Sequence, residues 1–377
     1  MKTAILTIED RINMVEDWLL NSGIQSDDGG FYAWQDIEDK SHTYLYSEIT
    51  GYAITALCFL YVISKNKVFI DRAKKAARWI LCDALDPSGG VLTRKYLKNA
   101  ISHYSFERGN IYSFDCAMAA FGMLKLYRTT SDSTYLDCAE KIIRFLDEKM
   151  LKPNGLYYPM FDTKDDTAKE DVKKWSTQSG SFHCKLALCL YELSVIKNDP
   201  SYDVKARRLI DSSVVNFNKE GRFVTGALNS TSHLHPYSYT LEGMLYYSYK
   251  TKDNSYKDAI EKAFNWIAGL QDKEGGFPTQ VFGDKKPDIA YKRSDIQAQV
   301  LRLSYFIRSG IDRARLLENI LELQNISMDY KGGFLFGTDE KGVFQKHSNA
   351  WCSMFALQAL YLASGKAGSD IVLDYLV

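Results

Sequence analysis

Polar side chains recur at the beginning of long apolar segments in this chain, where a buried helix is expected to carry apolar residues. Five of them have the groups needed for acid–base chemistry: Glu48, Asp115, His183, Glu242 and Asp295. Carboxyl and imidazole groups that meet in one pocket can divide the roles of proton donor, base and nucleophile. We therefore predict these five residues as catalytic candidates.

A second set of side chains, suited to binding a ligand, lies close to these candidates in the sequence. It consists of Tyr46, Arg108, His235, Tyr239, Arg293 and Trp351. Aromatic rings present a flat apolar face that suits sugars. Helix N-termini that point into a pocket favour anionic ligands such as uronates, sialic-type acids or sugar phosphates.

Each candidate also has a simpler structural explanation. Asp115 and Asp295 occupy positions where acidic residues cap a helix and complement its dipole, and Glu48 can do the same from a first turn. His183 precedes an apolar run and can be a core histidine with satisfied hydrogen bonds. Glu242 is harder to explain in this way, because burying a carboxylate costs several kcal/mol unless it is paired. The joint occurrence at corresponding positions favours a shared site.

Glycine turns divide the chain into six units of similar length. They contain Gly30, Gly90, Gly155, Gly221, Gly276 and Gly333, which are 55–66 residues apart. Each turn follows a segment with apolar residues at helical spacing and charged residues on the other faces, which predicts a half-exposed helix. Glycine supplies the left-handed conformation that ends such a helix.

A second helix, apolar on nearly all faces, is predicted after each turn and a loop of about 15–25 residues. These helices are expected at Glu48–Ile63, Asp115–Tyr127, Phe182–Val195, Tyr239–Tyr249, Asp295–Phe306 and Ala350–Leu362. Six exposed helices that alternate with six buried ones predict an all-α fold, an (α/α)6 toroid that spans residues 1–377 as one domain. All six loops then surround one mouth of the ring, where the starts of the buried helices meet.

Charge and composition exclude several classes of partner. Lys+Arg and Asp+Glu are 47 each, and no basic arm is present, so nucleic-acid binding is not expected. The longest apolar stretch, Gly51–Ile63, is shorter than the roughly 20 residues that cross a bilayer. The acidic loop Asp162–Lys174 is interpreted as a solvated flap and not as a metal site.

Cysteine usage and the first residues indicate a cytoplasmic protein. The seven cysteines lie mostly in apolar helical runs, and no Cys-x-x-Cys pair occurs, which predicts buried, reduced thiols and no zinc site. Residues 1–20 contain several charges and lack the pattern of a signal peptide. We expect no metal and no other cofactor.

The six-unit organisation resembles that of the six-hairpin α/α toroids, which include glycoside hydrolases, unsaturated-uronide hydrolases, some polysaccharide lyases, and the acylglucosamine and cellobiose 2-epimerases. Three segments, which begin at Tyr46, Ser113 and His235, also resemble a toroid family found alongside glycan-assembly genes. This resemblance implies a carbohydrate substrate. The Asp-x-Asp-Asp motif of squalene-cyclase-like toroids is absent from the sequence, which argues against terpenoid cyclisation.

The sequence is compatible with three functions. The leading hypothesis is a glycoside hydrolase in which Glu242 or Asp115 acts as the acid, with Glu48 or Asp295 as its partner. The alternatives are a sugar epimerase that uses His183 and His235, or a glycan-binding toroid without catalysis; a lyase is a further enzymatic variant. The sequence does not define the sugar, the linkage or the oligomeric state.

Overall fold

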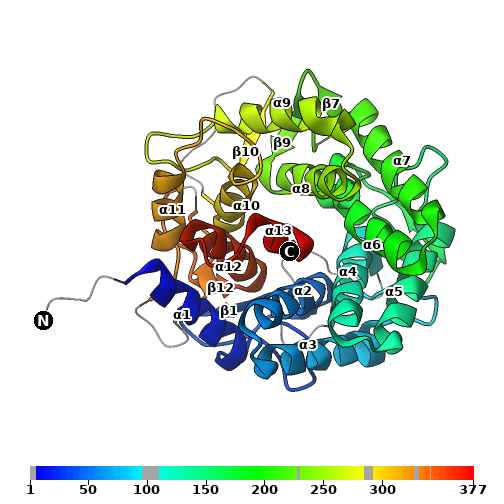
Figure 1. Cartoon of the computed structure of the whole chain (residues 1–377), viewed down its shortest axis with the longest axis horizontal. Coiled ribbons are helices and arrows are strands. Elements are labelled where there is room, and N and C mark those ends of the chain that lie inside the picture. The colour runs from blue at the N-terminus through cyan, green and yellow to red at the C-terminus, as the bar shows by residue number, and fades with distance from the viewer. Residues whose placement is uncertain (1–5, 96–109, 227–229, 284–291, 327–330, 340) are drawn as a thin grey trace, which may run out of the picture.

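The helices form a closed double ring in the computed structural model, which describes residues 6–95, 110–226, 230–283, 292–326, 331–339 and 341–377 (Figure 1). In this part of the chain, the outer helices are α1 (Ile8–Asn21), α3 (Lys67–Trp79), α5 (Ser133–Phe145), α7 (Pro200–Phe217), α9 (Lys257–Ala268) and α11 (Arg313–Glu322). The inner helices are α2 (Ser47–Ser64), α4 (Ser113–Thr130), α6 (Ala187–Lys197), α8 (Leu234–Thr251), α10 (Ser294–Ser304) and α12 (Ala350–Ser364). The 3₁₀ turn η4 (Ser181–Leu186) leads directly into α6. The predicted all-α toroid is therefore confirmed.

The outer and inner helices begin in different ways. Thr7, Asn66, Asp132, Asp199 and Asp312 each accept a backbone hydrogen bond at the start of an outer helix. By contrast, the N-cap residues of α2, α4, α8 and α10 make no side-chain capping hydrogen bond in the described structure. The N-termini of these four inner helices are thus left for other groups at the mouth of the ring.

Each glycine turn packs against the outer helix of the following hairpin. A Cβ atom on Gly29 would lie 2.2 Å from the Lys75 carbonyl oxygen of α3, and one on Gly275 would lie 2.3 Å from Arg315 Cβ of α11. The last turn repeats this contact with the first helix, because a Cβ on Gly332 would lie 2.0 Å from the Met14 oxygen of α1. These glycines also have positive φ angles. A side chain is therefore excluded by both conformation and space.

Two glycines bring neighbouring inner helices unusually close together. Gly51 of α2 faces α4, where a Cβ would lie 2.7 Å from backbone atoms of Met118 and Ala119. Gly122 of α4 faces back, and a Cβ there would lie 2.6 Å from the Gly51 oxygen. The backbones of α2 and α4 are therefore in contact at these two glycines. This contact fixes the relative positions of the residues at the starts of both helices.

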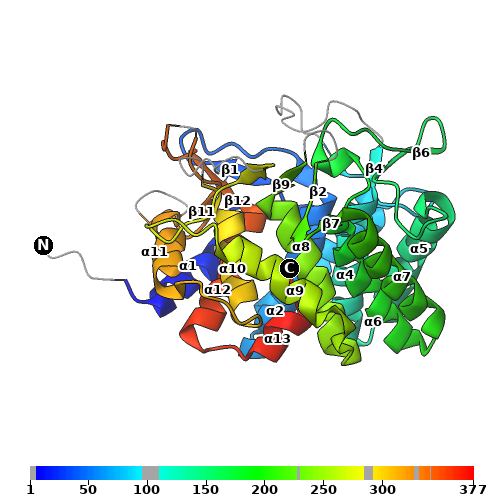
Figure 2. The same ribbon diagram turned by 90° about the horizontal axis from the view of Figure 1, so that it is seen from above.

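Short antiparallel strands from the long loops gather at one end of the ring, and the last helix, α13 (Ser369–Asp374), lies at the other (Figure 2). The strand pairs that matter for the site are β2 (Leu45–Tyr46) with β3 (Arg94–Lys95), and β9 (Thr231–His233) with β10 (Gln280–Phe282). In the sequence, β2 immediately precedes α2, and β9 immediately precedes α8. Strand pairing thus fixes the chain just before these inner helices begin.

The apolar core lies between the two layers of helices and continues into the axis of the ring (Figure 1). The α2 segment Ser47–Ser64 is long and apolar enough to cross a membrane, but 72% of it is buried inside the ring, as expected for a core helix. Cys82 is exposed, whereas the other six cysteines are buried, which confirms that most of them belong to the core.

The start of α8 differs from the prediction. The sequence pattern placed it near Tyr239, whereas the helix begins at Leu234. Pro236 is compatible with this start because proline is tolerated in the first turn of a helix. The earlier start places Glu242 eight residues into α8, about 12 Å along the axis. Glu48 and Asp115 instead lie in the first turns of α2 and α4.

Candidate functional site

A cavity of about 470 Å³ opens at the end of the ring where the strands lie. The described residues that line it come from the starts of the inner helices, from the strands β2, β3, β4 (Asn110–Tyr112) and β9, and from η4 with the loop before it. They are Tyr46, Glu48, Ile49, Arg94, Tyr112, Phe114, Asp115, Lys173, Lys174, Trp175, Ser176, Thr177, Phe182, His233, His235, Arg293 and Trp351. Its walls are therefore aromatic, with charged groups set between the rings.

Glu48 and Asp115 form a carboxyl pair in this cavity. Glu48 is partly exposed to the cavity and Asp115 is 3% exposed. The two groups are within hydrogen-bonding reach of each other. The close contact of α2 and α4 at Gly51 explains this proximity. Glu48 lies about one helical turn before Gly51, and Asp115 lies about one turn before the Met118 backbone that Gly51 faces.

The surroundings of the pair favour a shared proton. Burial raises the pKa of Asp115 well above its ordinary value, and the negative charge of Glu48 raises it further. Burial also raises the pKa of Glu48, but Tyr46 and the charges of Arg94 and Lys185 oppose that rise. Since two adjacent carboxylates cannot both ionise freely, Asp115 is the better site for the proton and Glu48 for the charge.

Arg94 also lines the cavity, and its charge lowers the pKa of both carboxyl groups, although the sequence alone did not single it out. β3 pairs with β2 so that Arg94 lies opposite Tyr46. The guanidinium lies 4.7 Å from the Tyr46 ring centre and 5.0 Å from that of Tyr44. The signal was available in principle, because Arg94 follows the second glycine turn as directly as Trp34 follows the first.

Asp295 lies outside the cavity lining but holds three side chains that line it. Its carboxylate accepts hydrogen bonds from Arg293 Nε at 3.1 Å and Trp351 Nε1 at 3.0 Å, and lies 3.4 Å from His235 Nδ1. Burial opposes ionisation, but Arg293 and these donors hold the pKa of Asp295 below its usual value. Asp295 therefore acts on the cavity by orienting other residues.

The two histidines of the cavity are neutral at ordinary pH. Burial lowers the pKa of His235 to about 4 in spite of the nearby Asp295 charge. Burial and the charge of Arg293 likewise lower the pKa of His233 to about 4. His235 also shares a hydrogen bond of 2.8 Å between Nδ1 and Gln299 Oε1. The cavity wall therefore contains two neutral imidazoles.

A loop before η4 forms one wall of the cavity. Trp175 lies 5.3 Å from the Phe182 ring and 6.0 Å from the His235 ring, measured between ring centres. Glu170 anchors this loop through Lys152 at 2.7 Å and Ser179 Oγ at 2.9 Å. The acidic flap predicted at Asp162–Lys174 is thus largely paired with lysines, and its far end reaches the cavity.

Glu242 lies below the cavity in a fully buried ionic cluster. Its carboxylate binds Lys185 Nζ at 2.8 Å and the Arg302 guanidinium, and Gln299 Nε2 is 3.5 Å away. The structure thus pairs this carboxylate with two cations and does not bring it to the carboxyl pair. The early start of α8 explains this position.

The remaining candidates fall into four groups. His183 is fully buried, where its Nε2 is 3.0 Å from Ser113 Oγ and its Nδ1 accepts the Gly180 N–H at 3.4 Å. Tyr239 lies just below the cavity, with its ring centre 4.5 Å from that of His235. Arg108 lies outside the described residues. The structure brings the other predicted residues, Tyr46, Glu48, Asp115, His235, Arg293 and Trp351, into the cavity lining.

Metal ligands do not cluster in the described part of the chain. No group of three or more His, Cys, Asp or Glu residues there is arranged to hold a metal ion. The carboxyl groups of the described cavity can transfer protons, and its aromatic and cationic side chains can bind a polar ligand.

Comparisons with known proteins agree with this architecture. Residues 103–234, about a third of the chain, match the profile of glycosyl hydrolase family 76. No curated protein sequence matches the chain. Among solved structures, a cellobiose 2-epimerase from Bacillus thermoamylovorans is 13% identical with a TM-score of 0.77, and the alignment covers 93% of this chain and 99% of that one.

Two further structures differ in their reactions but share the fold. An unsaturated glucuronyl hydrolase specific for heparin is 15% identical with a TM-score of 0.67, over 96% of this chain and 98% of that one. An α-1,6-mannanase of Salegentibacter, in an inactive form with α-1,6-mannotetrose, is 9% identical with a TM-score of 0.63, over 96% and 100% of the two chains. With its closed ring and these similarities, the chain is a six-hairpin α/α toroid.

Proposed function

We propose that this protein is a glycoside hydrolase that uses Asp115 as the general acid and Glu48 as its ionised partner. The observation that carries the proposal is the carboxyl pair at the cavity wall. Hydrolysis of a glycosidic bond requires one carboxyl group to protonate the leaving oxygen and a second to act as base or nucleophile. The different surroundings of Asp115 and Glu48 separate these two roles.

The cavity walls suit a sugar ligand. Trp175, Phe182, Phe114 and Trp351 provide apolar faces, while Arg94 and Arg293 provide hydrogen-bond donors between them. Aromatic side chains of this kind combine a large contact area with a defined orientation. The match to glycosyl hydrolase family 76 supports the same substrate class.

One difference from the α-1,6-mannanase bears on the mechanism. That protein was inactivated by replacing two aspartates at consecutive positions. Within residues 103–234, this chain has consecutive aspartates only at Asp165 and Asp166, which are exposed and pair with surface lysines. The proposed pair instead joins two helices, α2 and α4, so its second carboxylate lies outside the matched segment.

Sugar epimerisation is the second candidate, and the cavity-lining His233 and His235 favour it. In that reaction, imidazoles would exchange a carbon-bound proton. The lowered pKa values of both histidines make them weak bases, which favours hydrolysis. His183, the other histidine considered for this role, is bonded to Ser113 away from the cavity lining.

A single assay separates the two functions. The purified protein is incubated with linear manno-, gluco- and glucurono-oligosaccharides, and the products are identified by mass and by anomeric NMR signals. Hydrolysis adds one water per bond broken, whereas epimerisation leaves the mass unchanged. We expect hydrolysis that is lost in Asp115→Asn and Glu48→Gln and retained in Asp166→Asn. Activity that survives in both Asp115→Asn and Glu48→Gln would contradict the proposal.

A further inference from the structure

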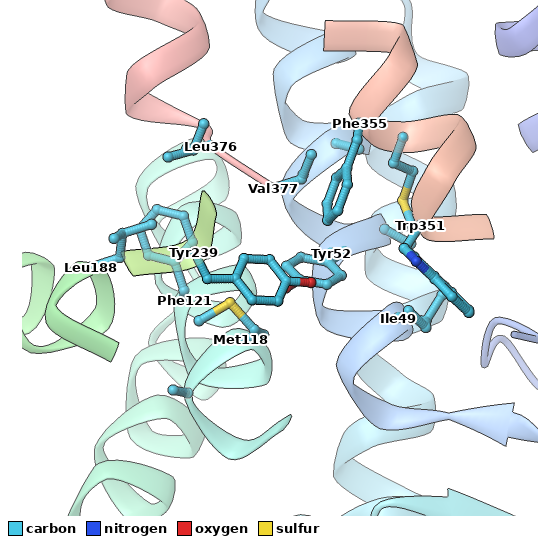
Figure 3. Close-up of a cluster of buried hydrophobic side chains, with 14 of the residues drawn as sticks. Ile49, Tyr52, Met118, Phe121, Leu188, Tyr239, Trp351, Phe355, Leu376 and Val377 are labelled. Atoms are coloured by element: carbon cyan, nitrogen blue, oxygen red, sulfur yellow. The ribbon is translucent and has the colours of Figure 1, made fainter. Parts of the chain in front are cut away.

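The cavity is closed at its inner end by a layer of aromatic side chains (Figure 3). Tyr52, Tyr239 and Phe355 lie one helical turn below the cavity-lining residues Glu48, His235 and Trp351 on the same helices. The rings of Tyr52 and Phe355 are 5.4 Å apart, and those of Tyr239 and Phe355 are 6.3 Å apart. All three side chains are at most 1% exposed.

The Lys185 ammonium group supports this aromatic floor from within the ring. Its Nζ lies 4.4 Å from the Tyr239 ring centre, 5.0 Å from that of Tyr52 and 5.4 Å from that of Phe355. A cation is attracted to the faces of such rings, particularly where water is excluded. Glu242 and Arg302 complete the ionic cluster around it.

The last residues of the chain fill the ring axis below this cluster. Lys185 Nζ donates to the Val377 oxygen at 2.8 Å, and Gln358 Nε2 donates to the Tyr375 oxygen at 2.6 Å. Leu376 and Val377 are at most 2% exposed and belong to the same buried apolar cluster as Tyr52, Tyr239 and Phe355, as Figure 3 shows. Aromatic, ionic and apolar layers thus block the ring in succession, so a polymer cannot thread through it.

The carboxyl pair lies close to this blocked end. Glu48 is four residues before Tyr52 in α2, which corresponds to about 6 Å along the helix axis. The Tyr52 hydroxyl interacts directly with the Glu48 carboxyl, so the pair lies on the floor, and the Trp175 loop forms a wall on one side of the cavity. A glycan that reaches the pair from the mouth of the ring therefore cannot extend past it, so the unit that it presents there is a chain end.

We infer that the protein acts on the ends of glycan chains and removes one terminal sugar at a time. This inference rests on the proposed hydrolysis and adds the class of substrate: a free chain end, with the rest of the glycan leaving through the mouth of the ring. A chain in which the terminal sugar is enlarged cannot enter, because the floor is built from packed side chains and not from a loop.

The first test is the order in which products form. Linear oligosaccharides of two to six units, labelled at the reducing end, are digested and sampled before one tenth is consumed. We expect a monosaccharide as the first product of every length, with either the labelled chain shortened by one unit or the label released on one unit. Early release of internal di- and trisaccharides from the hexamer would overturn the inference while leaving hydrolysis intact.

The second test uses binding, and it decides the inference even if no glycan is cleaved. Asp115→Asn is titrated with the same oligosaccharides, either unmodified, blocked by a 4,6-benzylidene acetal at the non-reducing end, or reduced to the alditol at the other end. One of the two modifications should weaken binding by about 100-fold, because the altered terminal unit meets the floor. Equal affinity for all three forms would overturn the inference, whereas absence of cleavage with end-dependent binding would reject only the hydrolysis.

Discussion

Two acidic sites lie on the inner helices of this toroid, and they differ in what surrounds them. Glu48 and Asp115 share a cavity wall with each other, whereas Glu242 is enclosed by Lys185 and Arg302. In the second site the cations satisfy the buried charge, so we expect it to stabilise the fold. In the first site a second acid increases the cost of ionisation, so burial and charge keep a proton available. Burial alone therefore does not distinguish a candidate proton donor from a paired carboxylate. The charge of the neighbouring group distinguishes them, because an acidic neighbour raises the pKa and a cation lowers it.

The largest effect is expected from removing the proposed catalytic groups. Asp115→Asn and Glu48→Gln keep the shapes of the side chains but remove proton transfer, and kcat/KM should fall by about 10³-fold. The matched control, Asp166→Asn, changes an exposed acid and should retain activity. If the two cavity variants are as active as this control, Glu48 and Asp115 are not the catalytic pair.

Glu242→Gln should affect stability more than catalysis. It leaves Lys185 and Arg302 buried without their carboxylate, so the free energy of unfolding should fall by about 3–5 kcal/mol. The value of kcat/KM per folded molecule, measured well below the melting temperature, should stay within several-fold of the original. Adding Lys185→Met to this variant should restore part of the stability, because it removes one uncompensated charge. A fully stable but inactive Glu242→Gln would reverse the comparison and make Glu242 the catalytic acid.

Gly51→Ala tests whether helix contact creates the carboxyl pair. The added Cβ would lie 2.7 Å from the α4 backbone, so α2 and α4 must separate. We expect a loss of about 2 kcal/mol in unfolding free energy and a lower kcat. The control is Gly310→Ala, because no atom lies within 4 Å of the Cβ added there. Equal effects of the two substitutions would show that close packing at Gly51 is unimportant.

The smallest effect concerns the pH dependence of stability. The pKa of Asp115 is raised in the folded protein, so its contribution to stability is complete below the unfolded pKa near 3.8 and is lost as pH rises through the folded pKa. Asp115→Asn removes this dependence and should therefore raise the melting temperature by a few degrees at pH 8, but not at pH 4. Thermal unfolding at both pH values measures the difference. A gain at pH 4 alone would contradict the assigned direction.

Much of the architecture could be predicted from the sequence, because glycine turns and apolar periodicity are local signals. The six hairpins and the approximate positions of Glu48, Asp115 and Trp351 followed from them. The depth of Glu242 did not, since it depends on where α8 begins, and Pro236 allows a start before Tyr239. An error of five residues in a helix start moves a side chain from a cavity to a core.

Other parts of the site depend on contacts between distant segments. Arg94 reaches the cavity through strand pairing with Tyr46, and Trp175 reaches it through a loop anchored by Glu170 and Lys152. Arg94 keeps the same spacing from its glycine turn as Trp34 keeps from the first, but neither the strand pairing nor the loop anchor is visible in the sequence. The proximity of Glu48 to Asp115 likewise requires the facing glycines of α2 and α4, whose partnership becomes visible only when the ring is assembled.

The contact of the last glycine turn with the first outer helix has a consequence for cooperativity. In an open array of repeats, the terminal units lack a neighbour and can fray independently. Here Gly332 packs on α1 as Gly29 packs on α3, so every hairpin has two neighbours. Loss of any one hairpin would expose two interfaces at once, which couples the stability of distant parts of the chain. Denaturation should therefore be concerted around the ring, and the opposed faces of the cavity should be lost together.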